Sequence, residues 1–328
     1  MWLGIGILLL AGICQGSFGL GYKKYHPLSW EAFWGIYMFF CAVITVVVTF
    51  ILVPNALDYY RALKDSELLF SIVCGMLWGI SAVGFSKGVD YIGMSLVYGL
   101  SMGISSVVGG LLPMIRQKIF LPGKGMFFLI LGMVITLAGI GVVTYAGILK
   151  ERKQENKSVE KGKFSKGIIM ALLSGLGSAA MNMGFDTTGV GNIARIPYIQ
   201  SSAIQWMPVL VGGAFAGIVY CVIQLTKNKT WHTYALKGAI PRFGMLFLTG
   251  IVWFLALYLY GIAANTLGRF GTSIGWVVFN ALALLISNGW GIKTGEWTGY
   301  SLEKKKLFIG NAILIISWFF VALAQCIS

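Results

Sequence analysis

The chain has 328 residues, of which 57% are hydrophobic and only 11% charged, and its 25 Lys and Arg against 11 Asp and Glu give a formal net charge of +14. Soluble domains carry about 25% charged residues, so this chain has too few to cover a water-exposed surface. The composition excludes a disordered chain, a secreted disulfide scaffold and an ordinary soluble enzyme, and it places the basic residues in loops between apolar spans, with no face for nucleic acid.

Ten apolar runs of roughly 17–25 residues follow one another along the chain and predict membrane helices. None alternates in the way a barrel strand would, and continuous helices satisfy the backbone hydrogen bonds in hydrocarbon. The first run is expected to be a retained helix, because no basic residue or cleavage site marks a signal peptide. The fold class is therefore an all-α polytopic membrane protein. The expected spans are residues 1–21, 32–53, 68–86, 94–114, 126–148, 167–185, 204–225, 243–264, 271–291 and 307–327.

The basic residues predict the orientation in the membrane. With ten spans, the odd-numbered loops share one side and carry 18 of the 25 Lys and Arg residues, whereas the even-numbered loops carry 7. Short basic loops stay in the cytoplasm, so both termini are predicted to lie outside. The most basic loop, residues 149–166, is interpreted as a cytoplasmic linker.

The two sides of this linker resemble each other, which predicts a repeat of five helices in residues 1–148 and another in residues 167–328. An offset of 163 places the glycines and aliphatic residues that begin at Gly4 on those that begin at Gly167, and an offset of 175 places Trp78 on Trp253. Because five is odd, the second copy enters the membrane from the opposite side. Inverted repeats are typical of alternating-access carriers with a site near the midplane.

Polar residues at membrane depth give the first candidate site. Ser174, Ser178, Asn182 and Asp186 recur every four residues and form a stripe on one helix face. The corresponding first span contains Gln15, with Phe18 beside it. Amides and hydroxyls suit a neutral polyol, although such residues also serve as hydrogen-bonding contacts between helices.

Aromatic residues in repeat-related positions give the second candidate site. Trp78 corresponds to Trp253, with Tyr260 on the same face as the latter, and Trp276 stands one turn from Asn280. Aromatic faces bind the C–H surface of sugars, and tryptophan is equally common as a packing residue. The substrate-binding candidates are Gln15, Phe18, Trp78, Ser178, Asn182, Trp253, Tyr260, Trp276 and Asn280.

At these residues the chain resembles the L-rhamnose/proton symporter family of the drug/metabolite transporter superfamily. The resemblance implies ten helices in two inverted repeats and proton-coupled uptake of L-rhamnose or a related deoxy sugar across a bacterial inner membrane. The matching segments run in order through the chain: Phe18, Tyr22-Lys23-Lys24, Ser29-Trp30-Glu31, Gly75 to Ile80, Tyr91 to Ser95, Lys150 to Lys153, Met181-Asn182, Gly250, Trp253, Trp276 and Glu296-Trp297.

Proton coupling requires a group that changes charge, and few are available near the helix ends. Glu31 is the first candidate, because it opens the second span and Lys23 or Lys24 could pair with it in one state. Asp186 is the second and Asp90 the third. The alternative for Glu31 is an interfacial carboxylate without a role in transport.

The sequence predicts no cofactor or metal site and no enzymatic activity. Its five cysteines lie in apolar runs without metal-binding spacing, and His26 and His232 fall in different loops. The expected partners are a monosaccharide, protons and the lipid bilayer. An exporter of small metabolites or drugs with the same fold is the alternative.

Overall fold

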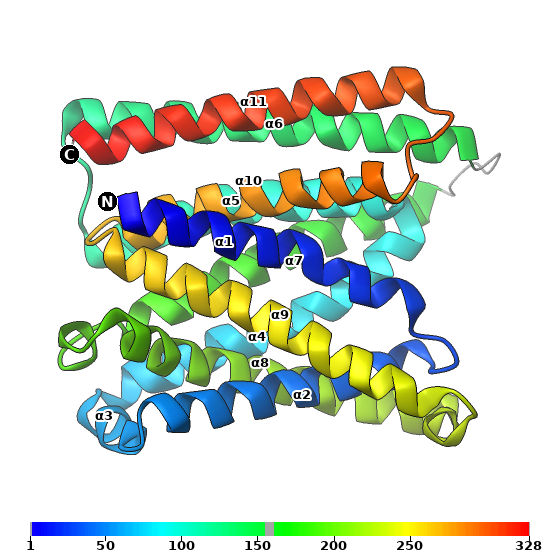
Figure 1. Ribbon diagram of the computed structural model, residues 1–328, viewed down its shortest axis with the longest axis horizontal. Helices are drawn as coiled ribbons and strands as arrows, with labels where there is room; N and C mark the ends of the chain where they lie inside the picture. Colours follow the sequence, from blue (N-terminus) through cyan, green and yellow to red (C-terminus); the bar gives the residue numbers. More distant parts are fainter. Residues whose placement is uncertain (1, 155–160, 328) are drawn as a thin grey trace. The chain divides into compact units, whose positions relative to one another are not determined.

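The computed structural model describes residues 2–154 and 161–327, whose regular elements are all helices (Figure 1). Ten of them are long and apolar enough to cross a membrane, which confirms the ten expected spans. The short elements between them were not predicted. The ten long helices are α1 (Trp2–Ser17, continued by η1), α2 (Trp30–Leu52), α4 (Asp65–Ile92), α5 (Met94–Gln117), α6 (Gly123–Gln154), α7 (Lys161–Thr188), α8 (Tyr198–Asn228), α9 (Ala239–Thr266), α10 (Gly271–Lys293) and α11 (Ser301–Ile327); the short elements are η1 (Phe18–Lys24), α3 (Ala56–Ala62), η2 (Ile193–Arg195) and η3 (Trp231–Ala235).

Local capping explains several helix ends. The Ser29 side chain accepts a hydrogen bond from the Ala32 N–H at 3.3 Å and begins α2. Helices α5 and α8 end at Lys118 and Lys229, whose φ angles of 54° and 56° are left-handed. The backbone N–H of each lysine turns back to the last carbonyls of its helix, as at many helix C-termini.

The chain forms two compact units that do not follow the halves of the sequence. Unit 1 comprises Met1–Ile80 and Met183–Thr266, and unit 2 comprises Ser81–Asn182 and Leu267–Ser328. Each unit therefore draws helices from both expected repeats, and α4 and α7 each contribute to both units. The candidate site residues are divided between the units in the same way.

In unit 1, glycines bring the first part of α4 against the backbone of α8. A Cβ at Gly75 would overlap the carbonyl oxygen of Val209, and one at Gly79 would overlap that of Gly213. Glycine is required at both positions because a side chain would prevent this approach. In lipid there is no hydrophobic effect to bring helices together, and close backbone packing stabilises their association instead. Helices α2 and α8, and α1 and α9, pack together in the same unit.

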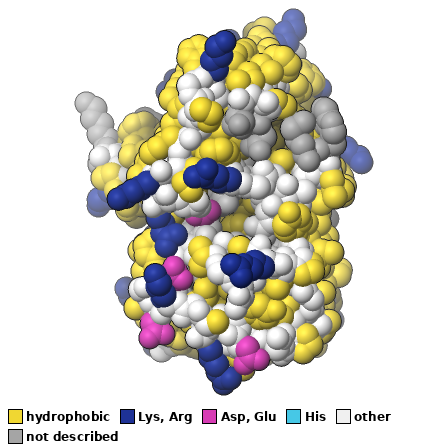
Figure 2. Space-filling model, turned by 90° about the vertical axis from the view of Figure 1, so that its left-hand side faces the viewer, with side chains coloured by type: hydrophobic (Ala, Val, Ile, Leu, Met, Phe, Trp, Pro, Cys, Tyr) yellow, Lys and Arg dark blue, Asp and Glu magenta, His cyan; other side chains and the backbone are white. Residues whose placement is uncertain are grey.

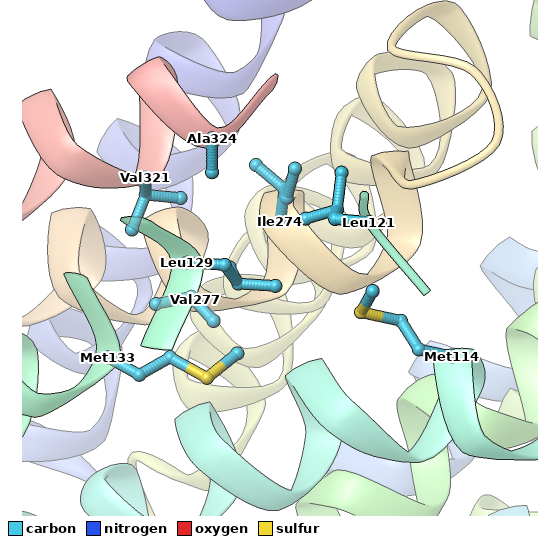
Figure 3. Packing of buried hydrophobic residues seen from close by; sticks show 8 residues of the cluster. All are labelled: Met114, Leu121, Leu129, Met133, Ile274, Val277, Val321 and Ala324. Atoms are coloured by element: carbon cyan, nitrogen blue, oxygen red, sulfur yellow. The ribbon is translucent and has the colours of Figure 1, made fainter. Parts of the chain in front are cut away.

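In unit 2, α6 and α11 lie side by side and run in opposite directions (Figure 1). A Cβ at Gly139 would meet Leu314, and one at Gly310 would meet Val143, so these helices also pack closely. One end of the pair closes on an apolar cluster shared with α5 and α10 (Figure 3). Its buried members are Met114, Leu121, Leu129, Met133, Ile274, Val277, Val321 and Ala324.

The basic linker expected at residues 149–166 is helical at both ends, because α6 extends to Gln154 and α7 begins at Lys161. Glu151 accepts hydrogen bonds at Oε1 from the backbone N–H and hydroxyl of Ser95, at 2.9 and 2.7 Å. The Nζ of Lys153 lies 2.5 Å from Oε1 of Glu303 in α11. These contacts fix the end of α6 to α5 and α11; residues 155–160 of the linker lie outside the described residues.

The surface is suited to lipid along the helices and to water at their ends. Large hydrophobic side chains such as Leu3, Ile51 and Ile240 are more than two-thirds exposed, at 70%, 71% and 78%. Figure 2 looks onto helix ends and shows Lys, Arg, Asp and Glu side chains among hydrophobic ones. This division is expected of a polytopic membrane protein.

Candidate functional site

A hydrogen-bonded cluster in unit 2 centres on Ser105 of α5. Its hydroxyl donates to Oγ of Ser178 at 2.8 Å and accepts from Nδ2 of Asn280 at 3.4 Å. The indole Nε1 of Trp276 donates to both the hydroxyl and the carbonyl oxygen of Ser105, each at 3.1 Å. The Ser105 cluster, defined by these four residues, therefore joins α5, α7 and α10.

Asn182 continues this polar contact one turn further along α7. Its Nδ2 donates to the carbonyl oxygens of Gly109 in α5, at 2.9 Å, and Thr272 in α10, at 3.4 Å. Gly109 is adjacent to the Ser105 cluster, because a Cβ there would lie 2.5 Å from Nε1 of Trp276. Three of the predicted residues, Ser178, Trp276 and Asn280, thus meet around Ser105, and Asn182 lies next to them.

The cluster is largely closed to solvent, with Ser178 half-buried at its edge. Ser105 and Asn182 are fully buried, and Trp276 and Asn280 are only 1% and 3% exposed. Buried polar groups are retained in an apolar setting only when they are paired, and hydroxyls and amides can exchange such bonds for those of a polyol. The cluster joins three helices, and its hydroxyl and amide groups are of the kind that bind hydroxylated ligands.

Unit 1 contains an aromatic stack on α4 and α9. The rings of Trp78 and Trp253 lie parallel, with centroids 5.2 Å apart and planes at 14°. Tyr37 of α2 packs edge-on against Trp253 at 6.2 Å. A Cβ at Gly213 would overlap the ring of Trp78, so the absence of a side chain at this glycine allows the indole to pack against α8. The two repeat-related tryptophans are in direct contact.

Tyr260, predicted on the same face as Trp253, packs against aromatic residues of α7 and α8. It is fully buried, and its ring lies 5.9 Å from Phe185 and 6.0 Å from Trp206. Gly261 lies against Trp206 and Phe185 and leaves space for both. Through this group Tyr260 joins α9 to α7 and α8.

Gln15 and Phe18 lie on α1 and η1 in unit 1. Oε1 of Gln15 is buried and, among the described residues, has no hydrogen-bond partner. The α-helix ends at Ser17, and Phe18 begins the 3₁₀ turn, so the helical spacing between Gln15 and Phe18 does not continue as expected. Gln15 is an available acceptor at membrane depth.

Glu31, the first proton-coupling candidate, is buried in unit 1 against the end of α8. Its Oε1 accepts hydrogen bonds from Nδ2 of Asn228 at 3.1 Å and from the hydroxyl of Thr230 at 2.5 Å. The Tyr234 hydroxyl donates to the carbonyl oxygen of the next residue, Ala32, at 3.1 Å. Burial, together with the neighbouring Cys221 and Glu31, raises the pKa of Tyr234 to about 12, so this hydroxyl remains neutral.

The expected pairing of Glu31 with Lys23 or Lys24 involves lysine side chains outside the described part of the structure. The side chain of the third candidate, Asp90, also lies outside the described part of the structure. What the structure does describe is a Glu31 carboxylate held by neutral donors from the end of α8 and the connection that follows it. Together with the bond from Tyr234 to the Ala32 carbonyl, these contacts join the start of α2 to this segment.

Asp186, the second candidate, is 8% exposed near the end of α7. Beside it, Gln205 of α8 donates to the Phe185 carbonyl at 3.4 Å and accepts from Nδ2 of Asn265 in α9 at 2.7 Å. Ser201 donates to the same Gln205 oxygen at 3.2 Å. This network places Asp186 in a polar junction of α7, α8 and α9.

The sequence interpretation did not include Ser105, Gln205, Asn228 and Thr230 among the site residues. Ser105 lies 175 residues before Asn280, the same offset that relates Trp78 to Trp253, so the expected repeat is the signal that could have identified it. The other three give no periodic pattern, and their contacts depend on chain crossings. Within residues 2–154 and 161–327, no group of three or more His, Cys, Asp or Glu could hold a metal ion.

Ten helices that are long and apolar enough to cross a membrane, with buried polar residues among them, are typical of polytopic membrane transporters. The sequence profile of the L-rhamnose-proton symport protein (RhaT) family matches residues 1–326. The chain belongs to this family, and it is a transporter and not an enzyme.

Individual relatives match along almost the whole chain. L-rhamnose-proton symporters from Shigella dysenteriae serotype 1 and from Escherichia coli (strain ATCC 8739) are 27% and 26% identical to it, and each alignment covers 96% of this chain and 95% of the relative. The symporter of that name from Klebsiella pneumoniae is 25% identical with the same coverage. One crystal structure, 13% identical, matches 98% of this chain and 97% of its own with a TM-score of 0.60, and it shares the fold.

Proposed function

We propose that the protein imports L-rhamnose or a closely related deoxy sugar together with protons, by alternating access, across the cytoplasmic membrane of a bacterium. The observation that carries the proposal is the family match over residues 1–326. Its full-length relatives are bacterial L-rhamnose-proton symporters. The ten apolar helices and the buried polar residues fit such a carrier.

The sugar is proposed to bind where hydrogen bonds of the Ser105 cluster can be exchanged for hydroxyl groups. Ser105, Ser178 and Asn280 offer donors and acceptors without fixed charge, which suits a neutral sugar. Asn182 adds an amide beside them. Trp78 and Trp253 of unit 1 are proposed as substrate-binding residues because aromatic rings are suited to the C–H surface of a sugar. Gln15, Phe18 and Tyr260 complete the set of proposed substrate-binding residues.

Alternating access is proposed to arise from two inverted five-helix repeats, residues 1–148 and 167–328. Helix pairing within the units supports this arrangement: α2 packs on α8, α5 on α10 and α6 on α11, and the members of each pair occupy corresponding positions in the two repeats. A twofold relation in the membrane plane produces such pairs. The distribution of basic residues supports an orientation with both termini outside.

Glu31 and Asp186 are proposed to couple the sugar to protons. Both are buried carboxylic residues at helix ends, and Glu31 accepts hydrogen bonds whose loss on protonation would free α2 from Asn228 and Thr230. One proton entering down about 100 mV releases about 2.3 kcal/mol, which would concentrate a neutral sugar about fiftyfold. Protonation and sugar binding together would then permit the carrier to change state.

Counterflow in proteoliposomes tests the substrate. Vesicles loaded with unlabelled L-rhamnose should accumulate labelled L-rhamnose from outside. Labelled L-fucose should accumulate less and labelled D-glucose least, because a buried site that hydrogen-bonds hydroxyl groups is selective for their arrangement. Accumulation of amino acids or cationic dyes instead of sugars would favour an exporter. Vesicles containing Asn280→Ala should show weaker L-rhamnose counterflow than wild type, with Asn288→Ala as control, because the Asn288 amide bonds Asn311 outside the Ser105 cluster.

A further inference from the structure

Unit 1 carries a groove at one end of its helices that the transport site does not account for. Two hollows of about 380 Å³ each open to solvent there, within the roughly 300–1,000 Å³ range of small-molecule sites. They adjoin, since Tyr59 and Asn192 line both. The groove runs between α3 with the start of α4 on one side and the segment after α7 on the other.

The lining is rich in hydrogen-bonding groups and balanced in charge. Asn55 and Asn192 precede α3 and η2, and neither side chain caps its own helix, so both amides are available. Asp58 and Glu67 supply negative charge, and Asp58 is paired with Arg61 of its own helix at 3.3 Å. The cationic members of the lining are Lys64 and Arg195. Such a balance selects for a neutral, hydroxylated ligand over a simple ion.

Tyr59 provides a fixed aromatic surface at the centre of the groove. One part of its side chain packs against an apolar cluster that includes Val53, Ile193 and Ile204, while the residue remains half-buried and lines both hollows. A ring supported in this way loses little conformational freedom when a ligand stacks on it. The combination of one aromatic ring with surrounding amides and carboxylates is suited to a monosaccharide.

The groove also lies beside the polar junction of Asp186. The Gly189 N–H donates to the Asp186 carbonyl at 3.2 Å, and the next residues, Val190 to Ile193, form a groove wall. Gly189 lies against Gln205, which belongs to the same junction. The groove is built from the second and sixth loops, which the distribution of basic residues places outside.

We propose that this groove is a second, peripheral sugar site that captures a neutral monosaccharide on the outer face before transport. The identity of the sugar and the outer position rest on the proposed function. The solvent-open walls imply weak, rapidly exchanging binding, which suits an entry site. Tyr59 stacks on the sugar ring, and Asn55 and Asn192 bond its hydroxyls.

A photoreactive L-rhamnoside bearing a diazirine, applied to the full chain in lipid nanodiscs, tests the proposal. Mass spectrometry should find label on residues 55–67 and 190–196 that excess L-rhamnose displaces. Tyr59→Ala should reduce this label about three- to tenfold, whereas Tyr59→Phe should retain it. Tyr198→Ala serves as the matched control, because Tyr198 is exposed and near the same end of the unit but does not line the groove.

The outcomes separate this proposal from the proposed function. If displaceable label is found in α5 and α10 but not in the groove, the peripheral site is contradicted and the proposed function is not. If label in the groove is displaced by phosphatidylethanolamine but not by L-rhamnose, the groove binds lipid, and the peripheral sugar site is again contradicted. No displaceable label anywhere contradicts both. In transport, Tyr59→Ala should raise KM about three- to tenfold at unchanged maximal rate; a lower maximal rate at unchanged KM would indicate a structural role and overturn the proposal.

Discussion

Trp276 donates its indole N–H to both oxygen atoms of Ser105, the hydroxyl and the backbone carbonyl, each at 3.1 Å. The contact joins α10 to α5 at a point where both residues are almost fully buried. Because a backbone carbonyl in a helix already accepts one bond, the indole uses its second lone pair and does not disrupt α5. The Ser105 hydroxyl is thereby fixed to face Ser178 and Asn280.

Ser105→Ala should destabilise the protein and weaken sugar binding. The substitution removes the donor to Ser178 and the acceptor of Asn280, and it leaves buried polar groups unpaired at about 1–3 kcal/mol. We expect a lower thermal unfolding midpoint and a smaller upward shift of that midpoint on adding L-rhamnose. Ser317→Ala is the control, since the buried Ser317 hydroxyl donates within its own helix, to the carbonyl oxygen of Leu314. Equal ligand shifts in both variants would contradict a role of Ser105 in binding.

Gly109→Ala should destabilise the protein although alanine favours helices. Its Cβ would lie 2.5 Å from Nε1 of Trp276 and 3.3 Å from Cα of Ala179, and such overpacking costs about 1–3 kcal/mol. Gly141→Ala is the matched control in α6, because nothing lies within 4 Å of that Cβ. The control should be neutral or stabilising by about 0.5–1 kcal/mol. Thermal unfolding of both variants measures the difference, and an unchanged midpoint for Gly109→Ala would show that Trp276 can move.

Glu151→Ala should loosen the start of α5. The carboxylate accepts both the Ser95 N–H and hydroxyl, and loss of such a cap costs about 0.5–2 kcal/mol. Glu151→Gln keeps an acceptor oxygen and should recover most of the stability. Hydrogen exchange at residues 94–98 is the measurement, and equal protection in wild type and Glu151→Ala would refute the capping role.

The raised pKa of Tyr234 predicts that the free energy of unfolding decreases at alkaline pH. Its pKa is raised from the ordinary 10 to about 12, so its neutral form stabilises the fold fully below pH 10, and this contribution is lost as the pH rises toward 12. The unfolding midpoint of wild type should fall more steeply between pH 10 and 12 than that of Tyr234→Phe, which has no group to ionise. Parallel pH profiles would argue against a buried neutral hydroxyl at this position.

Much of this architecture could be predicted from the sequence, because lipid makes the requirements simple. Apolar runs gave the ten spans, and the pairs Trp78 with Trp253 and Trp276 with Asn280 were chosen by spacing and repeat position. The two tryptophans stack, and Asn280 meets Trp276 at Ser105. These contacts could be predicted because periodicity identifies the residues that share one face of a helix, and helices pack against each other through such faces.

Other parts could not be predicted, since they depend on which helices meet. Asn228 and Thr230 contact Glu31 across about two hundred residues, and no local pattern indicates this. The division into units also follows packing between α4, α7 and their neighbours instead of the sequence halves. Tyr260 was grouped with Trp253 by spacing, but spacing does not indicate that its ring packs against Phe185 of α7 and Trp206 of α8.

Glu31→Gln and Asp186→Asn should separate sugar movement from proton movement. Each variant keeps the shape and hydrogen-bonding oxygen of the side chain and removes its ability to ionise. We expect at least one to retain L-rhamnose counterflow, which needs no net proton flux, and to lose accumulation driven by a pH gradient. Both variants with undiminished gradient-driven accumulation would exclude these carboxylates from coupling.

The most direct test of the account is sugar-driven proton uptake into proteoliposomes that contain the wild-type protein and a pH-sensitive dye. Addition of L-rhamnose outside, without an initial pH gradient, should acidify the interior, whereas D-glucose should have little effect. L-rhamnose entry without acidification would contradict proton coupling, and neither entry nor acidification would contradict the proposed substrate.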